Sequence, residues 1–365
     1  MLVVKDTPLE VGWLRWSIKP PTPSLVLVVK GSFSIAPRGP ATFPEEQELL
    51  TGDVYDDGDP LRSLVYDSDF AILKPRAETF LVGTCHAPRG QRVSTAVVSF
   101  RLGAIQKRLA ILGDRYWKKG VLGGVTDPVP FDQMPLRWER SFGGPGYKLN
   151  PVGRGIARDP IDAEGRVPLP NIELPQTLLR KPSERPEPAG AAPIAKTWDS
   201  RLRYGGRYDI RWRTTRFPYF PSNFDYSYFN AAPRDQQIVG YFRGDERIEL
   251  SGLHPDHQHV RSQLPGIKAR TFLARERGSA LIEVPLVLDT VVLDAEAMEV
   301  RCVWRGNREV PGFSEETFAD IFVCHEPLGT DRGIRDYEAD YHAALQRMAA
   351  EQAAFEAVPM PTEKL

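Results

Sequence analysis

The sequence has few cysteines, no long apolar run and no excess of charge of either sign. Its three cysteines, Cys85, Cys302 and Cys324, cannot all pair, and their spacing does not suggest a disulfide framework. A helix that spans a bilayer needs about 20 consecutive apolar residues, and no run approaches that length. Residues 1–6 also lack the basic and apolar regions of a secretory signal. We therefore expect a protein of the reducing cytoplasm, without a membrane span.

The charged side chains are almost balanced, with 47 Lys and Arg against 48 Asp and Glu. Proteins that bind nucleic acid or anionic membrane surfaces without specificity normally carry a basic excess. We therefore expect no nucleic-acid partner. The 365 residues, 41% of them hydrophobic, are enough to bury a substantial core in one large or two moderate domains.

Sequence motifs for catalysis are also missing. There is no glycine-rich phosphate loop, no dinucleotide fingerprint and no Gly-x-Ser-x-Gly elbow. Two Cys-His dipeptides, Cys85-His86 and Cys324-His325, lie in strand-like contexts, where neighbouring side chains point to opposite faces. The acidic pairs occur at positions typical of turns, which explains them without catalysis. We therefore expect no catalytic residue and no cofactor.

One histidine-rich stretch has the composition of a metal site. His254, His257 and His259 lie within six residues together with Asp256, and imidazole with carboxylate can bind a transition metal. However, Pro255 and the polarity of the stretch indicate a loop, and no remote ligand is evident. The favoured interpretation is that these three histidines are exposed loop residues or hydrogen-bond the nearby backbone, and they remain the candidates for a metal site.

Alternating apolar residues predict a mainly β fold. Residues 25–35 alternate clearly, residues 93–102 and 109–112 predict a hairpin, and residues 282–288 and 298–304 repeat the alternation. The 33 prolines and 30 glycines favour many short strands joined by ordered loops. We expect antiparallel sheets arranged as a sandwich or barrel, with long ordered loops and one C-terminal helix.

The chain is predicted to divide into three parts. Residues 1–180 form an N-terminal β region, and residues 181–330 form a second β region that can share one core with the first. The boundary is the proline-rich stretch 181–188. Residues 331–365 contain an amphipathic helix and a tail, because apolar side chains recur at three- and four-residue steps. Packing on the protein's own sheet is the favoured interpretation of this helix, and docking on a partner is the alternative.

Strings that combine arginine, proline and aromatic residues are the most distinctive feature of the sequence. Arginine and large aromatic residues dominate binding hot spots, but the same residue types also anchor long loops. Both interpretations stay open at this point. The candidate partner-binding residues are Arg137, Trp138, Arg140, Phe142, Arg154, Tyr228, Phe229 and Arg234.

The same strings carry a resemblance to a known family. The main ones, in chain order, are Gly113-Asp114-Arg115-Tyr116-Trp117, Met134-Pro135-Leu136-Arg137-Trp138-Glu139-Arg140-Ser141-Phe142-Gly143-Gly144, Asn150-Pro151-Val152-Gly153-Arg154-Gly155 and Phe229-Asn230-Ala231-Ala232-Pro233-Arg234-Asp235-Gln236-Gln237. Together they resemble a formerly uncharacterised domain family that is encoded beside type VI secretion effectors. The resemblance extends from Met1 to Glu326.

The resemblance implies a non-enzymatic adaptor or chaperone without a cofactor. Such a protein binds a toxic effector in the cytoplasm and helps load it onto the secretion spike of valine–glycine-repeat and PAAR tip proteins. The family pattern supplies no catalytic residue. An alternative is a carbohydrate-binding or carbohydrate-active β-protein, because Trp, Tyr, Asp and Arg in loops over a sheet also suit sugar recognition.

Overall fold

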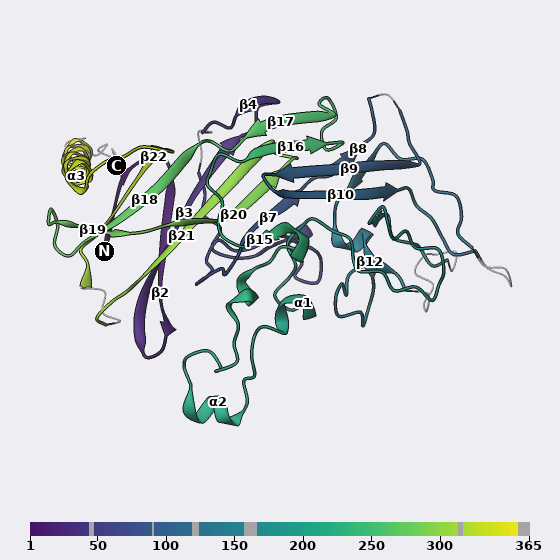
Figure 1. The fold of residues 1–365 in the computed structure, drawn as a ribbon, viewed down its shortest axis with the longest axis horizontal. Coiled ribbons are helices and arrows are strands. Elements are labelled where there is room, and N and C mark those ends of the chain that lie inside the picture. Colours follow the sequence, from purple (N-terminus) through teal and green to yellow (C-terminus); the bar gives the residue numbers. More distant parts are fainter. Residues whose placement is uncertain (44–46, 90, 119–123, 157–165, 313–316, 357–365) are drawn as a thin grey trace, which may run out of the picture. The chain divides into compact units, whose positions relative to one another are not determined.

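The computed structural model of the chain is organised in two compact units (Figure 1). Unit 1 comprises residues 1–29, 267–287 and 304–365, and unit 2 comprises residues 30–266 and 288–303. The structure describes residues 1–43, 47–89, 91–118, 124–156, 166–312 and 317–356.

Unit 1 contains a four-stranded sheet in the order β1-β22-β18-β19. β1 is parallel to β22, whereas β18 is antiparallel to both of its neighbours. Phe272 of β18 and Phe322 of β22 are paired and fully buried, so the alternating residues of these strands supply the core of the unit. The strands of the unit are β1 (Leu2–Asp6), β2 (Glu10–Lys19), the first part of β3 (Thr22–Ser34), β18 (Ile267–Ala274), β19 (Leu281–Val284), the last part of β21 (Glu299–Glu309) and β22 (Asp320–Pro327).

The C-terminal helix α3 (Ile334–Glu356) packs on the sheet of its own unit. Tyr337, Tyr341 and Ala344 are buried against Phe272 and Phe322. These residues recur at the three- and four-residue steps of one helix face, as the sequence indicates. The favoured interpretation of the helix is therefore confirmed. The tail from residue 357 onward lies outside the described residues.

A six-stranded sheet of unit 2 has the order β14-β10-β9-β16-β17-β4. Its centre is the predicted hairpin, in which Leu102 of β9 faces Ile105 of β10 across a tight turn. Gly103 has a φ of +55° in that turn, a conformation that glycine adopts without steric cost. The strands are β4 (Arg38–Pro40), β9 (Thr95–Leu102), β10 (Ile105–Leu112), β14 (Ile172–Glu173), β16 (Arg247–Ser251) and β17 (His259–Gln263).

A second sheet contributes largely buried strands to unit 2. β7 (Ala77–Val82) is buried along its whole length and pairs in parallel with β20 (Val287–Asp294), while β15 (Gln237–Ile238) forms the edge. Next to β20 come the parts of β21 and β3 that belong to unit 2. The alternation of residues 25–35 predicts that Lys30 of β3 lies on a polar face. Instead, Lys30 is buried, and its Nζ lies 2.8 Å from Oδ2 of Asp69. The ion pair compensates for the burial of both charges.

Short elements complete unit 2. They are the strands β5 (Val54–Tyr55), β6 (Leu64–Tyr66), β8 (Thr84–His86), β11 (Gln133–Pro135), β12 (Phe142–Gly143) and β13 (Arg154–Gly155), the helices α1 (Asp199–Leu202) and α2 (Ile210–Thr215), and the 3-10 turns η1 (Asp56–Gly58), η2 (Trp138–Arg140), η3 (Tyr226–Phe229) and η4 (Arg234–Gln236).

The predicted fold class is confirmed, since 39% of the residues are in strands and 14% in helices. Among the described strand pairings most are antiparallel, and the parallel ones include β1 with β22 and β7 with β20. The alternating run 282–288 is not one strand, because β19 ends at Val284 and Pro285 has no N–H for a ladder. The predicted boundary at residues 180 and 181 lies inside unit 2. Along the described part of the chain, no helix combines the length and the apolarity needed to cross a membrane.

Candidate binding site

A segment of unit 2 that is rich in arginine and aromatic residues is held at its base by a buried arginine. Arg201 donates from Nε to the carbonyl oxygen of Tyr228 at 3.0 Å. Its Nη1 donates to Oδ1 of Asp67 at 3.0 Å and to the carbonyl oxygen of Ile194 at 2.8 Å. These bonds fix the two ends of the segment against the body of unit 2. We call residues 202–229 the arginine–aromatic lobe.

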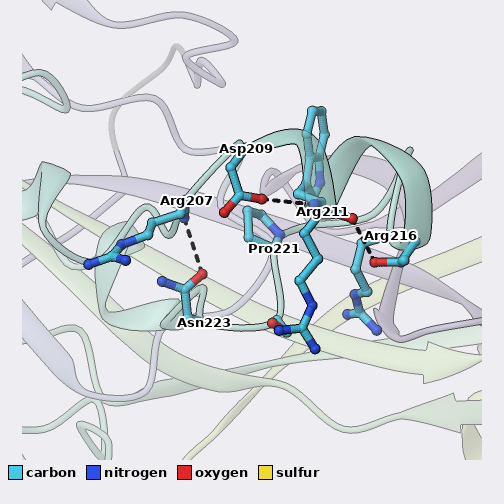
Figure 2. Close-up of a pocket in the computed structure, with 9 residues that line it drawn as sticks. Arg207, Asp209, Arg211, Arg216, Pro221 and Asn223 are labelled. Carbon is cyan, nitrogen blue, oxygen red and sulfur yellow. Dashed lines mark hydrogen bonds between the residues drawn. The ribbon is translucent and has the colours of Figure 1, made fainter.

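The tip of the lobe is the short helix α2, which projects from the sheets of unit 2 in Figure 1. Oδ1 of Asp209 accepts a hydrogen bond from the N–H of Trp212 at 2.9 Å and so caps the helix. A concavity of about 280 Å³ lies beside α2. In Figure 2 the side chains of Arg211 and Arg216 extend in the same direction along it. Several guanidinium groups therefore lie around one hollow at the tip.

Aromatic packing gives the lobe an ordered interior without regular strands. The rings of Phe220 and Phe224 stack with their centroids 4.0 Å apart and their planes at 9°. The indole N–H of Trp212 donates to the carbonyl oxygen of Tyr219 at 2.7 Å, and its ring meets Tyr208 edge to face. Such ring pairs are worth about 0.5–1.5 kcal/mol beyond the area they bury. The lobe is therefore a folded element.

The outer surface of the lobe combines exposed apolar side chains with arginines. Ile210 is 72% exposed, Phe217 67% and Tyr208 56%. Residues 202–229 contain five arginines and two aspartates. Within the described chain, no carboxylate lies within ion-pair distance of any of these five arginines; they are Arg203, Arg207, Arg211, Arg213 and Arg216. Exposed apolar groups next to unpaired guanidinium groups are typical of protein-binding surfaces.

Three of the sequence-predicted candidates lie at the base of the lobe. Tyr228 and Phe229 belong to η3 and are half-buried, and Phe229 packs against the rings of Phe220 and Phe224. Arg234 of η4 is exposed, and its Nη1 donates to Oε1 of Gln237 at 3.2 Å. Tyr228 and Phe229 therefore brace the lobe, whereas Arg234 is accessible beside it.

Trp138 and Phe142 are buried and anchor their loop. Trp138 is 3% exposed, its indole N–H donates to the carbonyl oxygen of Pro193 at 2.9 Å, and its ring meets Trp198 edge to face. Phe142 is 1% exposed in a cluster with Leu169 and Leu179. In this conformation neither side chain offers its ring to a partner. These two residues fit the anchoring interpretation that the sequence left open.

The remaining three candidates surround a second concavity of about 280 Å³ in unit 2. Arg137 donates from Nε to Oδ1 of Asp56 at 3.2 Å. Arg140 and Arg154 each place Nη1 3.3 Å from Oδ1 of Asn171. The candidate residues therefore divide into buried anchors, residues at the base of the lobe, and an arginine cavity at η2 and β13.

The histidine-rich loop is arranged as a turn. Nδ1 of His254 accepts hydrogen bonds from the N–H groups of Asp256 and His257, both at 3.1 Å, and the two imidazoles stack. His259 instead contacts the hydroxyl of Ser251 through Nδ1 at 3.1 Å. Over the described ranges, no group of three or more His, Cys, Asp or Glu residues is positioned to hold a metal ion.

All three cysteines are buried as free thiols. Burial raises the pKa of Cys85 and of Cys324 to about 12, and burial also raises the pKa of Cys302. Because the thiolate is the nucleophilic form, these thiols are poorly suited to covalent catalysis at neutral pH. They behave as small apolar core residues.

The exposed residues of the lobe were missed by the sequence reasoning. Tyr208, Ile210, Arg207 and Arg211 were not among the candidates, although aromatic density in this region predicted an ordered loop. The available signal was the dense alternation of arginine with aromatic residues in residues 201–216. These residues differ from Trp138 and Phe142 because their side chains are exposed to solvent. Solvent exposure depends on the tertiary structure.

Comparison with known proteins places the chain in a family. A family model described as "Uncharacterized protein conserved in bacteria (DUF2169)" matches residues 22–305. The chain belongs to this family. No curated protein and no solved structure matches it. The DUF2169 match includes the arginine–aromatic lobe, Arg140 and Arg154, whereas helix α3 lies beyond its C-terminal limit.

Proposed function

We propose that this DUF2169 protein is a non-enzymatic adaptor or chaperone that holds another polypeptide. The observation that carries the proposal is the outer surface of the arginine–aromatic lobe, where Ile210, Phe217 and Tyr208 are exposed beside unpaired arginines. Large exposed apolar side chains are costly in water unless a partner covers them. Arginine and aromatic side chains are also the residues that contribute most at protein interfaces.

The construction of the lobe supports binding without large rearrangement. Arg201 fixes its base and the Phe220–Phe224 stack fills its interior, so the exposed residues are presented on an ordered element. Pre-ordering reduces the conformational entropy that a loop loses on association. A lobe of this kind can bind a folded or partly folded client tightly without an energy source.

The family resemblance indicates which class of protein the client belongs to. The strings around Arg137–Gly144 and Phe229–Gln237 resemble proteins encoded beside type VI secretion effectors, so the proposed client is such an effector. The proposed destination is the spike of valine–glycine-repeat and PAAR proteins, in the cytoplasm where the spike assembles. Transfer follows from tighter binding of the effector at the spike, since a ligand moves to the state or site for which its affinity is higher.

The test is co-expression with the neighbouring effector gene followed by size-exclusion chromatography. We expect one co-eluting complex with the wild-type protein. The double variant Tyr208→Ala/Ile210→Ser should weaken the complex by at least about tenfold, since truncating central interface residues typically costs more than 1 kcal/mol each. The matched control is Val239→Ser, which changes a residue that is 81% exposed outside the lobe.

The possible outcomes separate the parts of the proposal. Absence of any complex with the wild-type protein would overturn the adaptor function. Equal co-elution of the client with the wild type and with the lobe variant would show that the client binds outside the lobe. Turnover of a glycan by the isolated wild-type protein would instead favour the carbohydrate-active alternative.

A further inference from the structure

Two arginines of unit 2 are held side by side by local backbone structure. Arg140 ends the 3-10 turn η2, and Arg154 begins β13, which pairs in parallel with β12 directly after η2. The N–H of Arg154 donates to the carbonyl oxygen of Ser141 at 2.9 Å. Its Nε donates to the carbonyl oxygen of Glu139 at 2.8 Å. The Arg154 side chain is therefore fixed to the same turn that carries Arg140.

Asn171 holds both guanidinium groups in one place. Its Oδ1 lies 3.3 Å from Nη1 of Arg140 and 3.3 Å from Nη1 of Arg154. Its Nδ2 donates to the carbonyl oxygen of Leu112 and to Oδ1 of Asp114, both at 3.0 Å. Asn171 is fully buried, so its amide cannot turn away. The two like charges are thus brought together by a neutral residue.

Buried arginines of unit 2 are paired with carboxylates, whereas the half-buried Arg140 and Arg154 have no such partner among the described residues. Arg115 pairs with Glu173, and Arg201 pairs with Asp67. For Arg140 and Arg154, no carboxylate of a described residue lies within ion-pair distance. Burial and the neighbouring Arg140 lower the pKa of Arg154. Asp114 and Glu139 only partly offset this effect, so an anion bound by both guanidinium groups would relieve their repulsion further.

The carboxylates that line the same cavity are engaged elsewhere. Glu139 accepts hydrogen bonds from the N–H and the hydroxyl of Ser63. Asp56 pairs with Arg62 and Arg137, and Glu296 accepts from the hydroxyl of Thr84 at 2.8 Å. The charged lining consists of four arginines and three carboxylates, and Arg62 also pairs with Asp57, which lies outside that lining. Among the described residues of the lining, Arg140 and Arg154 are therefore the two arginines without a carboxylate within ion-pair distance.

We propose that Arg140 and Arg154 together bind one carboxylate group of an acidic segment of a partner polypeptide. A guanidinium has five N–H donors in a planar fork that matches a carboxylate. Arg140 uses one of its donors on Asn171, and Arg154 uses two on Asn171 and Glu139. Both arginines line a concavity of about 280 Å³, which has room for a carboxylate side chain. This inference deepens the proposed function and rests on it.

The charge of the lining favours a carboxylate over a phosphate. A phosphate group carries nearly two negative charges at neutral pH, so nearby carboxylates repel it more strongly than they repel a carboxylate. It would also lie close to the fixed carboxylates of Asp56, Glu139 and Glu296, which line the same space. A carboxylate carries one charge and meets less repulsion. Aspartate, glutamate and the chain end of a polypeptide all present this group.

The test uses a fluorescein-labelled hexaglutamate peptide and the purified full-length protein, with fluorescence anisotropy as the measurement. We expect the wild type to bind the peptide and the double variant Arg140→Gln/Arg154→Gln to bind at least tenfold more weakly. The matched control is Arg247→Gln/Arg261→Gln, which removes the same charge from exposed positions on β16 and β17. The single variant Arg140→Gln keeps the hydrogen bonds of Arg154 to backbone carbonyl groups. It replaces the double variant in the test if the double variant does not fold.

Competition distinguishes the source of the anion. Displacement of the peptide by acetate at lower concentrations than by inorganic phosphate supports the carboxylate assignment, and the reverse order overturns it. Wild-type binding that the Arg140 and Arg154 variants do not weaken also overturns it. The peptide assay needs no effector, so it can fail while the effector still co-elutes with the protein. In that case the adaptor function stands and the carboxylate site does not.

Discussion

Nη1 of Arg201 lies 3.0 Å from Oδ1 of Asp67, and both side chains are buried. This ion pair joins the base of the arginine–aromatic lobe to the loop after β6. Burial opposes the ionisation of Asp67, but Arg201, Lys74 and Lys196 hold its pKa below the ordinary value. The pair therefore couples the stability of unit 2 to the position of the proposed client surface.

Removing Arg201 should destabilise the protein and loosen the lobe. The variant Arg201→Ala removes the closest cation from the buried Asp67 and leaves Lys196 at 3.8 Å, so the cost should be about 3 kcal/mol, the lower end of the range for breaking a buried pair. Urea unfolding measures this loss, and limited trypsin digestion should cleave within residues 202–229 first. The control Arg213→Ala changes an exposed arginine of α2 and should stay within about 0.5 kcal/mol of the wild type. Equal stability of both variants would contradict the anchoring role.

The contribution of Asp67 to the stability of the folded protein should be lost at acidic pH. A carboxylate whose pKa is lower in the folded state stabilises the fold above its unfolded pKa, about 3.9, and loses this effect as the pH falls through the lowered folded pKa. The variant Asp67→Asn should therefore be less stable than the wild type at pH 7, and the difference should shrink below pH about 4. Urea unfolding at pH 7, 5 and 3 measures it. A difference that stays constant with pH would count against this assignment.

Trp138 and Arg140, neighbours in one motif, should behave differently on substitution. Trp138→Ala removes a buried indole and should cost about 3–5 kcal/mol of unfolding free energy. Arg140→Gln removes one long hydrogen bond at a partly exposed position, so its cost should be below about 1 kcal/mol. Chemical denaturation compares them. If Trp138→Ala were as stable as Arg140→Gln, the buried anchor described here would be wrong.

The three thiols should resist labelling in the native protein. With a pKa of about 12, the thiols of Cys85 and Cys324 are thiolate in only about one molecule in ten thousand at pH 8. A thiol-reactive dye should label the folded protein slowly and should label all three cysteines after unfolding in guanidinium chloride. Rapid labelling of the native protein would show that unit 1 or unit 2 opens readily around these residues.

Tyr341 should stabilise helix α3 through its hydroxyl. This hydroxyl donates to Oδ2 of the fully buried Asp320, and burial with that bond raises the pKa of Tyr341 to about 12. Tyr341→Phe keeps the packing but leaves the carboxylate without this donor, which should cost about 1–3 kcal/mol. Thermal unfolding measures the loss. Tyr208→Phe, at an exposed position, is the matched control and should change little.

The sequence by itself determined the local elements. Alternation in residues 93–112 specified the β9–β10 hairpin, because strand geometry exposes every second side chain to the same face. The spacing of Tyr337 and Tyr341 specified one face of helix α3 in the same way, through the helical period. The prolines and glycines also predicted short strands joined by long loops, such as the strands β5, β6 and β8.

Only the tertiary structure decided which arginine and aromatic residues are accessible. Trp138 and Arg140 belong to one motif, yet the first fills the core beside Trp198 and the second faces a cavity. Neighbours along a turn differ in burial because distant segments, here residues 189–198 and Asn171, fill the space on one side. Local patterns carry no information about such long-range contacts. The proximity of Arg140 to Arg154 and the exposure of Ile210 are therefore determined by tertiary packing.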